Sequence, residues 1–347
     1  MSVAPVDVGR RRIGDGQPCY VIAEAGSNHD ARLDQARRLI DVAAEAGADA
    51  VKFQLFRASK LYARQAGRSE YLKLERSIYD VIADMEMPYD WLPALAEHAG
   101  ARSIDFMASA FDEESVDRIA ALVPAFKIAS YEMTHLPLVR HAAAKGKPLI
   151  VSTGTADLDE VRETVAAVGL TPLALMQCTA AYPAPLSALN LRAIVTLKAA
   201  FGVPVGLSDH SRDPLVGPLA AVALGANLLE KHFTLSNRLP GPDHGFAVEP
   251  DELSLLVRKL RETESALGTG DKTVQPIEQE LRRFARRAIF VARPVAAGEP
   301  LGPENLVILR CGVLEPGLPP SAWERVVGRR AARPLSAEAP LTAADYA

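Results

Sequence analysis

Short apolar runs alternate with amphipathic stretches from about residue 20 to residue 267. Runs of this length, bounded by turn residues, are typical of strands buried in a parallel sheet. Between the runs lie helical patterns, for example at residues 33–46, where Ala36, Leu39 and Ala43 share one helix face. We predict strands at residues 20–25, 50–54, 105–108, 125–128, 148–152, 173–177, 204–207 and 228–233.

Glycines mark the ends of two of these helical stretches. Gly47 and Gly225 each follow a helical pattern and precede a strand, and glycine readily adopts the positive φ that ends a helix. Repeated strand–helix units over this length predict the α/β fold class and, within it, a (β/α)8 TIM barrel. An open doubly wound sheet is the alternative, and the absence of a glycine-rich dinucleotide fingerprint disfavours it.

The composition changes after the expected barrel. We predict a barrel domain at residues 1–270, a charged linker with some helix at residues 271–287, and a β-rich module at residues 288–347. Pro and Gly turns separate short strands in this module. Because about 60 residues form a small core, we expect the module to lean on a partner, such as a second subunit.

The composition and charge exclude several classes of protein. Of 347 residues 48% are hydrophobic, and the net charge is -4 without a basic stripe, which argues against a nucleic-acid partner. No apolar run reaches membrane-spanning length, and no apolar segment of a signal peptide follows Arg10, Arg11 and Arg12. Three scattered cysteines without a CxxC pair fit a reducing compartment. We therefore expect a cytoplasmic protein that contacts no membrane.

Polar side chains lie at the ends of nearly all predicted strands, where a barrel places its active site. One serine or lysine there has a simple explanation as a helix cap or a surface group. Their coincidence at one rim is the informative observation. The set is Glu24, Lys52, Gln54, Ser109, Lys127, Ser130, Glu132, Ser152, Gln177, Tyr182, Ser208, His210, Glu230 and His232.

These residue types fit particular ligands. Lys52 and Lys127, with nearby hydroxyls and helix N-termini, can hold a phosphate together with a carboxylate. His210 and His232 end adjacent strands and can share one divalent ion whose other positions stay open. Two imidazoles suit a loosely held ion such as Mn²⁺ or Mg²⁺ better than a structural zinc.

Several segments around these residues, in this order, resemble the sialic acid (N-acetylneuraminate) synthase family: "IAEAGSNHD", "AAEAGADAVKFQ", "PAFKIASYE", "PLIVSTGTA", "CTAAYPAP", "GLSDHSRDP", "EKHFTL" and "LPGPDH". The tail "RRAIFVARPVAAGEPLGPENLVILRCG" resembles the β-clip domain of that family, called antifreeze-like or SAF. The resemblance covers almost the whole chain. Taken together the motifs are specific, although no single one is.

The resemblance implies a transferase of EC class 2.5.1 that condenses phosphoenolpyruvate (PEP) with an N-acetylated hexosamine similar to N-acetylmannosamine. The products would be a nonulosonic acid and phosphate. Glu24 and Glu230 would be catalytic, with Glu230 positioning water or moving a proton. Mn²⁺ is the expected metal, with Mg²⁺ or Co²⁺ as alternatives.

The remaining implied roles belong to binding. His210 and His232 would hold the metal. Arg310 would reach the active site of a partner subunit, which implies a domain-swapped homodimer. The PEP residues would be Lys52, Ser109, Lys127, Ser130, Ser152 and Ser208, and the sugar residues Gln54, Glu132, Tyr182, Asp243 and Arg310.

Some positions depart from the family pattern. Ser109 stands where threonine is usual but keeps the hydroxyl. Ala180 replaces a polar residue beside the substrates, which leaves the identity of the sugar open, while Ala31 and Cys311 replace a glycine and a proline. The sequence also resembles members linked to spore-coat polysaccharide. Residues 58–88 form a long connection in which we expect a lid or a sugar-side wall.

Two other functions fit parts of the pattern. A metal-independent aldolase could form a Schiff base through Lys52 or Lys127, although the paired histidines disfavour it. A non-catalytic sugar-binding or ice-binding protein would fit the C-terminal module but leaves the polar rim unexplained.

Overall fold

The computed structural model describes residues 3–68 and 75–347 of the chain. The chain divides into two units, Met1–Gly268 and Thr269–Ala347, and each is described by itself. The expected domain boundary at residue 270 lies beside this division. Part of the expected lid at residues 58–88 lies outside the described residues.

A closed barrel of eight parallel strands forms the first unit, as the alternating pattern predicted. The last strand pairs with the first, so that Glu230 lies opposite Ile22 and His232 opposite Glu24. The barrel therefore has no open edge. Its strands in chain order are β3 (Tyr20–Gly26), β4 (Ala50–Leu55), β5 (Asp105–Ala110), β6 (Phe126–Ile128), β7 (Leu149–Ser152), β8 (Leu173–Cys178), β9 (Val205–Asp209) and β10 (Leu228–His232).

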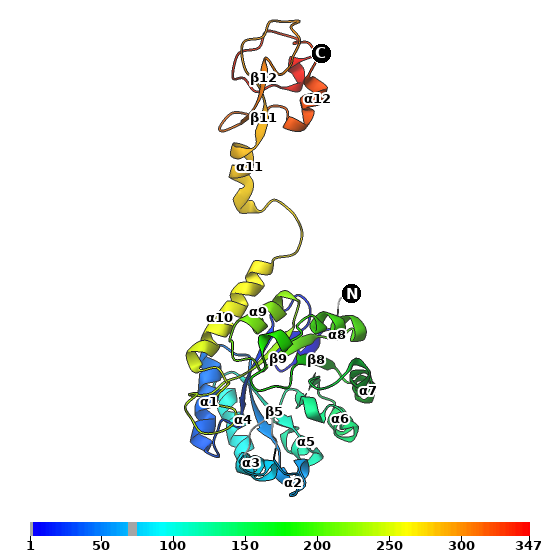
Figure 1. Ribbon diagram of the computed structural model, residues 1–347, viewed down its shortest axis with the longest axis vertical. Helices are drawn as coiled ribbons and strands as arrows, with labels where there is room; N and C mark the ends of the chain where they lie inside the picture. The colour runs from blue at the N-terminus through cyan, green and yellow to red at the C-terminus, as the bar shows by residue number, and fades with distance from the viewer. Residues whose placement is uncertain (1–2, 69–74) are drawn as a thin grey trace. The chain divides into compact units, whose positions relative to one another are not determined.

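Helices surround the barrel and cover the outward side chains of its strands (Figure 1). Two short helices, α2 (Ala58–Leu61) and α3 (Ile78–Asp84), lie in the long connection after β4. The helices that pack on the barrel are α1 (Leu33–Glu45), α4 (Leu92–Ala101), α5 (Glu113–Ile119), α6 (Leu136–Ala143), α7 (Leu158–Val168), α8 (Ala193–Phe201), α9 (Val216–Ala223) and α10 (Pro250–Leu267). This ring completes the predicted TIM-barrel architecture.

An N-terminal hairpin, which the sequence pattern did not predict, closes the end of the barrel at which the strands begin; we call this the lower end, and the end at which the strands finish the upper end. Its strands are β1 (Val6–Val8) and β2 (Arg11–Ile13). Val8 and Ile13 are fully buried and pack with Tyr20 at the start of β3. The interior of the lower barrel is therefore filled with apolar side chains.

The second unit is a small β-rich module that begins with a helical turn and α11 (Gln279–Ala285). Its strands β11 (Arg287–Val291) and β12 (Leu306–Arg310) pair antiparallel, and α12 (Trp323–Val326) follows. Ile289 and Val326 are fully buried in its core. In the described part of the chain, no helix is both long and apolar enough to cross a membrane.

Candidate active site

Lys52 is the centre of a buried polar group at the upper end of the barrel. Its Nζ lies 2.8 Å from Glu24 Oε2 and donates to Ser109 Oγ at 2.7 Å. Gln54, two residues further along β4, donates to the other oxygen of Glu24 at 2.9 Å. Strand alternation places Lys52 and Gln54 on the same face, so both reach the carboxylate on the neighbouring strand.

Lys127 repeats this arrangement on the other side of the barrel. Its Nζ donates to Ser152 Oγ at 2.7 Å and lies 3.6 Å from Glu230 Oε1. The same Glu230 accepts from Ser208 Oγ at 3.0 Å, and its second oxygen lies 3.6 Å from Lys52 Nζ. We call the residues that these contacts join the rim cluster: Glu24, Lys52, Gln54, Ser109, Lys127, Ser152, Ser208 and Glu230.

The helix-cap explanation for the serines does not hold. The caps of the helices after β5 and β7 are Asp112 and Asp157, whose side chains accept from backbone N–H groups. Ser109 and Ser152 instead accept from the two lysines. These hydroxyls serve the barrel interior and not the helices.

The two carboxylates of the rim cluster have pKa values that are shifted in opposite directions. Burial raises the pKa of Glu24 to about 7, against the opposing effect of Lys52. Glu230 is equally buried, but Lys127 and Lys52 together hold its pKa below the ordinary value. Carboxylates separated in this way can take different roles, one exchanging a proton and one staying charged.

The lysines also differ. Burial opposes the charge of Lys52, yet the carboxylates of Glu230 and Glu24 raise its pKa overall. For Lys127 burial prevails and the pKa is lowered, although Glu230 opposes this change. The surroundings of Lys52 therefore favour its charged form, and those of Lys127 stabilise its charge less well.

His210 and His232 lie side by side above the rim cluster. An imidazole nitrogen binds a divalent ion at about 2.1 Å, so two rings sharing one ion have centroids roughly 4.5 to 6.5 Å apart. The observed centroids are 5.3 Å apart. His210 Nδ1 donates to the Thr179 carbonyl at 2.9 Å, so Nε2 is the nitrogen left for an ion.

The donor set fits a divalent ion with few protein ligands. His232 Nδ1 is buried without a hydrogen-bond partner, and burial lowers the pKa of this ring well below its usual value, so it is neutral. Within the described residues, no group of three or more His, Cys, Asp or Glu side chains could hold a metal ion. Water and substrate oxygens would have to complete the coordination of an ion between the two imidazoles.

Aromatic and acidic side chains surround the histidines. Tyr182 stacks on His210 with centroids 4.2 Å apart, and Phe246 packs against His232 at 5.1 Å. Asp243 Oδ2 lies 3.8 Å from His232 Nδ1. Gly26 at the end of β3 has φ +53, and a Cβ there would lie only 2.9 Å from that carboxylate. A glycine at this position therefore lets Asp243 approach Glu24.

Ser130 and Glu132 follow β6 in a short 3-10 helix. Ser130 Oγ accepts from the backbone N–H of Gly154 at 3.0 Å, so it joins the ends of two neighbouring strands. Glu132 is buried, and its Oε2 has no hydrogen-bond partner. Burial raises the pKa of Glu132 to about 7. A buried, unpaired carboxyl beside a polar rim is available to a substrate.

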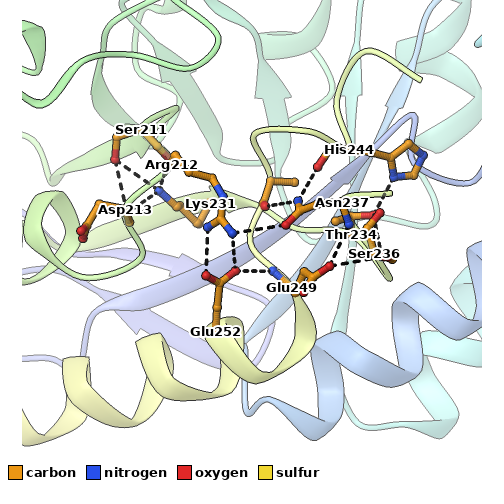
Figure 2. A network of polar contacts seen from close by, with 11 residues as sticks. Ser211, Arg212, Asp213, Lys231, Thr234, Ser236, Asn237, His244, Glu249 and Glu252 are labelled. Atoms are coloured by element: carbon orange, nitrogen blue, oxygen red, sulfur yellow. Dashed lines mark hydrogen bonds and ion pairs between the residues drawn. The ribbon is translucent and has the colours of Figure 1, made fainter. Parts of the chain in front are cut away.

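Figure 2 shows the polar network that holds the loop carrying Asp243 and Phe246. Arg212 makes two hydrogen bonds of 3.0 Å to Glu252 at the start of α10. Asn237 donates to the carbonyls of His244 and Ala247, and Thr234 bonds the ring of His244. The loop is therefore fixed at both of its ends without using any rim-cluster residue.

The structure brings together most of the expected site residues. Arg310 lies in the second unit, and two contacts of the histidines were not expected from the sequence. Arg310 ends β12 in the second unit and is exposed there. The Thr179 carbonyl and Phe246 were missed, because a backbone acceptor and one phenylalanine in a loop give no signal in a sequence. Their contacts with His210 and His232 nevertheless set the ring positions.

Comparison with known families agrees with this arrangement. A model of the NeuB family matches residues 39–272, and a model of the SAF domain matches residues 286–347. The chain belongs to the NeuB family. The expected resemblance to sialic acid synthases with a C-terminal SAF domain is thereby confirmed.

Relatives of this NeuB-family chain carry names of synthases of related acids and of a polysaccharide pathway. The spore coat polysaccharide biosynthesis protein SpsE of Bacillus subtilis is 42% identical over 97% of this chain and 95% of its own. The N,N'-diacetyllegionaminic acid synthase of Legionella pneumophila is 40% identical over 93% of each chain. The crystal structure of the N-acetylneuraminic acid synthetase of Leptospira borgpetersenii superposes with a TM-score of 0.75 at 33% identity, covering 81% of this chain and 96% of that one.

Proposed function

We propose that the upper end of the barrel condenses PEP with the open-chain form of an N-acetylated hexosamine, giving a nonulosonic acid and phosphate. One observation carries the proposal: two buried lysines, each bonded to a serine on the neighbouring strand, share Glu230 next to two adjacent imidazoles. The names of the relatives support the substrate class. Which hexosamine is used depends on the loops around Asp243 and Ala180.

The rim cluster would hold PEP by its two anionic groups. Lys52 and Lys127, with Ser109, Ser152 and Ser208, offer a set of donors for a phosphate and a carboxylate, and Ser130 adds a further hydroxyl. Fixing both ends of PEP presents its C3 carbon to one side. This orientation lowers the entropic cost of bringing the two substrates together.

The carboxylates would manage charge and protons. C3 of PEP forms the new bond with the aldehyde carbon of the sugar, and the aldehyde oxygen takes a proton. Water then adds to C2 and loses a proton, which leaves a hydroxyl on the carbon that carries the phosphate. The bond between C2 and the phosphate ester oxygen breaks, phosphate leaves with the electron pair, and the hydroxyl gives up its proton to become the keto group. Glu24, with a pKa of about 7, suits the proton transfers, and the charged Glu230 stabilises positive charge at C2.

His210 and His232 would hold a divalent ion, with Mn²⁺ proposed first. When bound, the ion would polarise the aldehyde oxygen of the sugar as a Lewis acid. Gln54, Glu132, Tyr182 and Asp243 would line the sugar side. Tyr182 in particular would cover the sugar through its stacked position on His210.

We further propose that Arg310 of one protomer completes the sugar side of its partner in a domain-swapped homodimer. Exposed apolar side chains on the module support an interface there: Leu309 lies next to Arg310, and Val313 and Leu314 follow. Mixing an Arg310→Ala protein with a Lys127→Met protein tests this. In a swapped dimer each site takes its barrel from one protomer and Arg310 from the other, so a mixed dimer holds one intact site of two. Random exchange in an equal mixture makes about half of the dimers mixed, so the mixture should regain up to about a quarter of wild-type activity. Without a swap, the mixture should show only the average of the activities of the two separate proteins.

The central experiment measures phosphate release from PEP with a panel of N-acetylated six-carbon sugars, together with mass spectrometry of the products. We expect release with at least one sugar, loss in EDTA, and recovery with Mn²⁺. A product lacking the mass of the sugar plus the three-carbon acid would contradict the proposal. Borohydride trapping of a lysine adduct, with activity that survives EDTA, would indicate the Schiff-base aldolase instead.

A further inference from the structure

A basic cavity lies at the lower end of the barrel, opposite the rim cluster. Its volume is about 240 Å³. Tyr20 begins strand β3 and Asp49 directly precedes strand β4, and both side chains are almost fully buried. The lining residues are Arg10, Arg11, Arg12, Gln17, Pro18, Tyr20 and Asp49.

The charge of this lining is not balanced from within. It contains three arginines and one aspartate, which leaves a net charge of +2 in a chain whose total is -4. The neighbouring Asp105 carboxylate, which accepts from the Tyr20 hydroxyl at 2.7 Å, offsets part of this positive charge. Asp49 is already satisfied, because one oxygen pairs with Arg11 at 2.7 Å and the other accepts from Arg261 and the backbone N–H of Val21. Its charge therefore positions Arg11 and does not neutralise the other two arginines.

Arg10 and Arg12 remain available. Among the described residues, no carboxylate lies within ion-pair distance of Arg10, although its charge acts on the nearby Asp105 carboxyl, where burial raises the pKa and Arg10 opposes this rise. Arg12 lies 3.6 Å from Asp7 in a pair that is largely exposed. Exposed pairs of this kind contribute little free energy. Both guanidinium groups can therefore turn toward a ligand at small cost.

The backbone that carries these arginines is held firmly. The hairpin buries Val6, Val8 and Ile13 against the barrel interior. Its turn passes so close to Asp105 that a Cβ on Gly9, which has φ +56, would lie 2.5 Å from the carboxylate. Arg10 therefore follows a turn that only glycine fits, and its position is set before any ligand arrives.

We propose that this basic cavity binds a small anion through a phosphate or carboxylate group. Guanidinium groups present paired N–H donors that match the oxygens of either group. The volume admits one such group with a small organic part. The site is separate from the rim cluster because the apolar layer of the lower barrel lies between them.

Hydrogen exchange of the full chain, measured by mass spectrometry, can test the site with inorganic phosphate at constant ionic strength. We expect phosphate to protect peptides covering residues 9–20. Arg10→Gln and Arg12→Gln should each raise the phosphate concentration needed for protection about tenfold. Arg162→Gln is the matched control, because Arg162 pairs with Asp159 on the exposed face of α7, and it should change nothing.

Three further readouts separate the possible outcomes. Citrate in place of phosphate distinguishes a carboxylate ligand, and protection by either anion supports the site. Equal protection by sodium chloride, or protection that the arginine variants keep in full, would overturn the proposal. Catalytic activity without added anion should be unchanged in both variants, which shows that they fold and keeps this test independent of the reaction at the rim.

Discussion

Strand β10 buries charged side chains on both of its faces, and the two faces differ in how fully those charges are bonded. Toward the barrel interior, Glu230 Oε2 and His232 Nδ1 lack hydrogen-bond partners. Toward the helices, Lys231 Nζ lies 2.7 Å from Asp209 and also donates to the carbonyls of Ser211 and Asp213. We call Lys231, Asp209, Ser211 and Asp213 the outer cluster; part of it is drawn in Figure 2.

The difference separates two uses of a buried charge. A charge inside a protein is tolerated when its hydrogen bonds are complete, and the outer cluster meets that condition. The inner face leaves bonds unmade, which costs stability unless a substrate or ion completes them. We infer that the outer cluster maintains the fold and the rim cluster performs the function.

Lys127→Met should have the largest effect on function. The change removes one of the two cations expected to bind PEP, and a lost electrostatic contact of this kind lowers kcat/KM about 10³-fold. Glu230 keeps Lys52 and Ser208, so the melting temperature should shift by only a few degrees. Phosphate-release kinetics and calorimetry measure the two quantities. Retention of more than about a tenth of the activity would contradict the inferred role.

Lys231→Met should show the reverse pattern. It leaves Asp209 buried without its cation, and the free energy of unfolding should fall by about 3 kcal/mol. The folded fraction should keep its kcat, because the side chain points away from the rim. Adding Asp209→Asn to the same protein removes the unpaired charge and should recover part of the loss. A selective loss of kcat in Lys231→Met would contradict the purely structural role that we infer for the outer cluster.

The inner face of β10 could be predicted from sequence, but the outer face could not. Spacing by two put Glu230 and His232 on one side, and adjacent strand ends brought His210 near. Lys231 lies in the same apolar run, and its partner Asp209 is known only once β9 and β10 pair in register. Alternation reveals which residues share a face but not which distant residue will neutralise a charge.

The N-terminal hairpin shows the same limit. Its strands are only three residues long, so the alternation of Val6 and Val8 is too brief to predict a strand. The place where the hairpin docks depends on the apolar interior of a barrel that no local pattern describes. The sequence pattern consequently gave no binding role to the arginines of its turn and its second strand.

Glu132→Gln tests whether a buried carboxyl outside β10 also lowers stability, as we expect of the incompletely bonded groups on the inner face of β10. Oε2 of Glu132 has no hydrogen-bond partner. Burial raises the pKa of Glu132 from 4.5 to about 7, so the folded state holds a proton that the unfolded state has released between these values. Wild-type stability should therefore decrease as pH rises from about 4.5 to 7, by at most about 3 kcal/mol from this group. The glutamine variant cannot lose a proton, so its stability should be higher near pH 7 and flatter over this range.

Urea titrations at several pH values give the required stabilities. Glu97→Gln on α4 serves as a control for the loss of one carboxyl. If the free energy of unfolding of wild type and of Glu132→Gln changes equally with pH, the Glu132 carboxyl is fully hydrogen-bonded in solution. It would then differ from Glu230 and His232 on the inner face of β10.

The smallest effect is expected for Ser109, whose single hydroxyl either contributes to PEP binding or only supports Lys52. Ser109→Ala removes the acceptor of the 2.7 Å bond from Lys52, but Lys52 keeps its contact with Glu24. Loss of one such bond to a charged donor weakens binding by about 1 to 2 kcal/mol, so KM for PEP should rise about tenfold. Ser109→Thr keeps the hydroxyl and should stay close to wild type. Equal KM values for the alanine and threonine variants would mean that the Ser109 hydroxyl does not contribute to PEP binding. Its bond to Lys52 would then stabilise the fold, as the bonds of the outer cluster do.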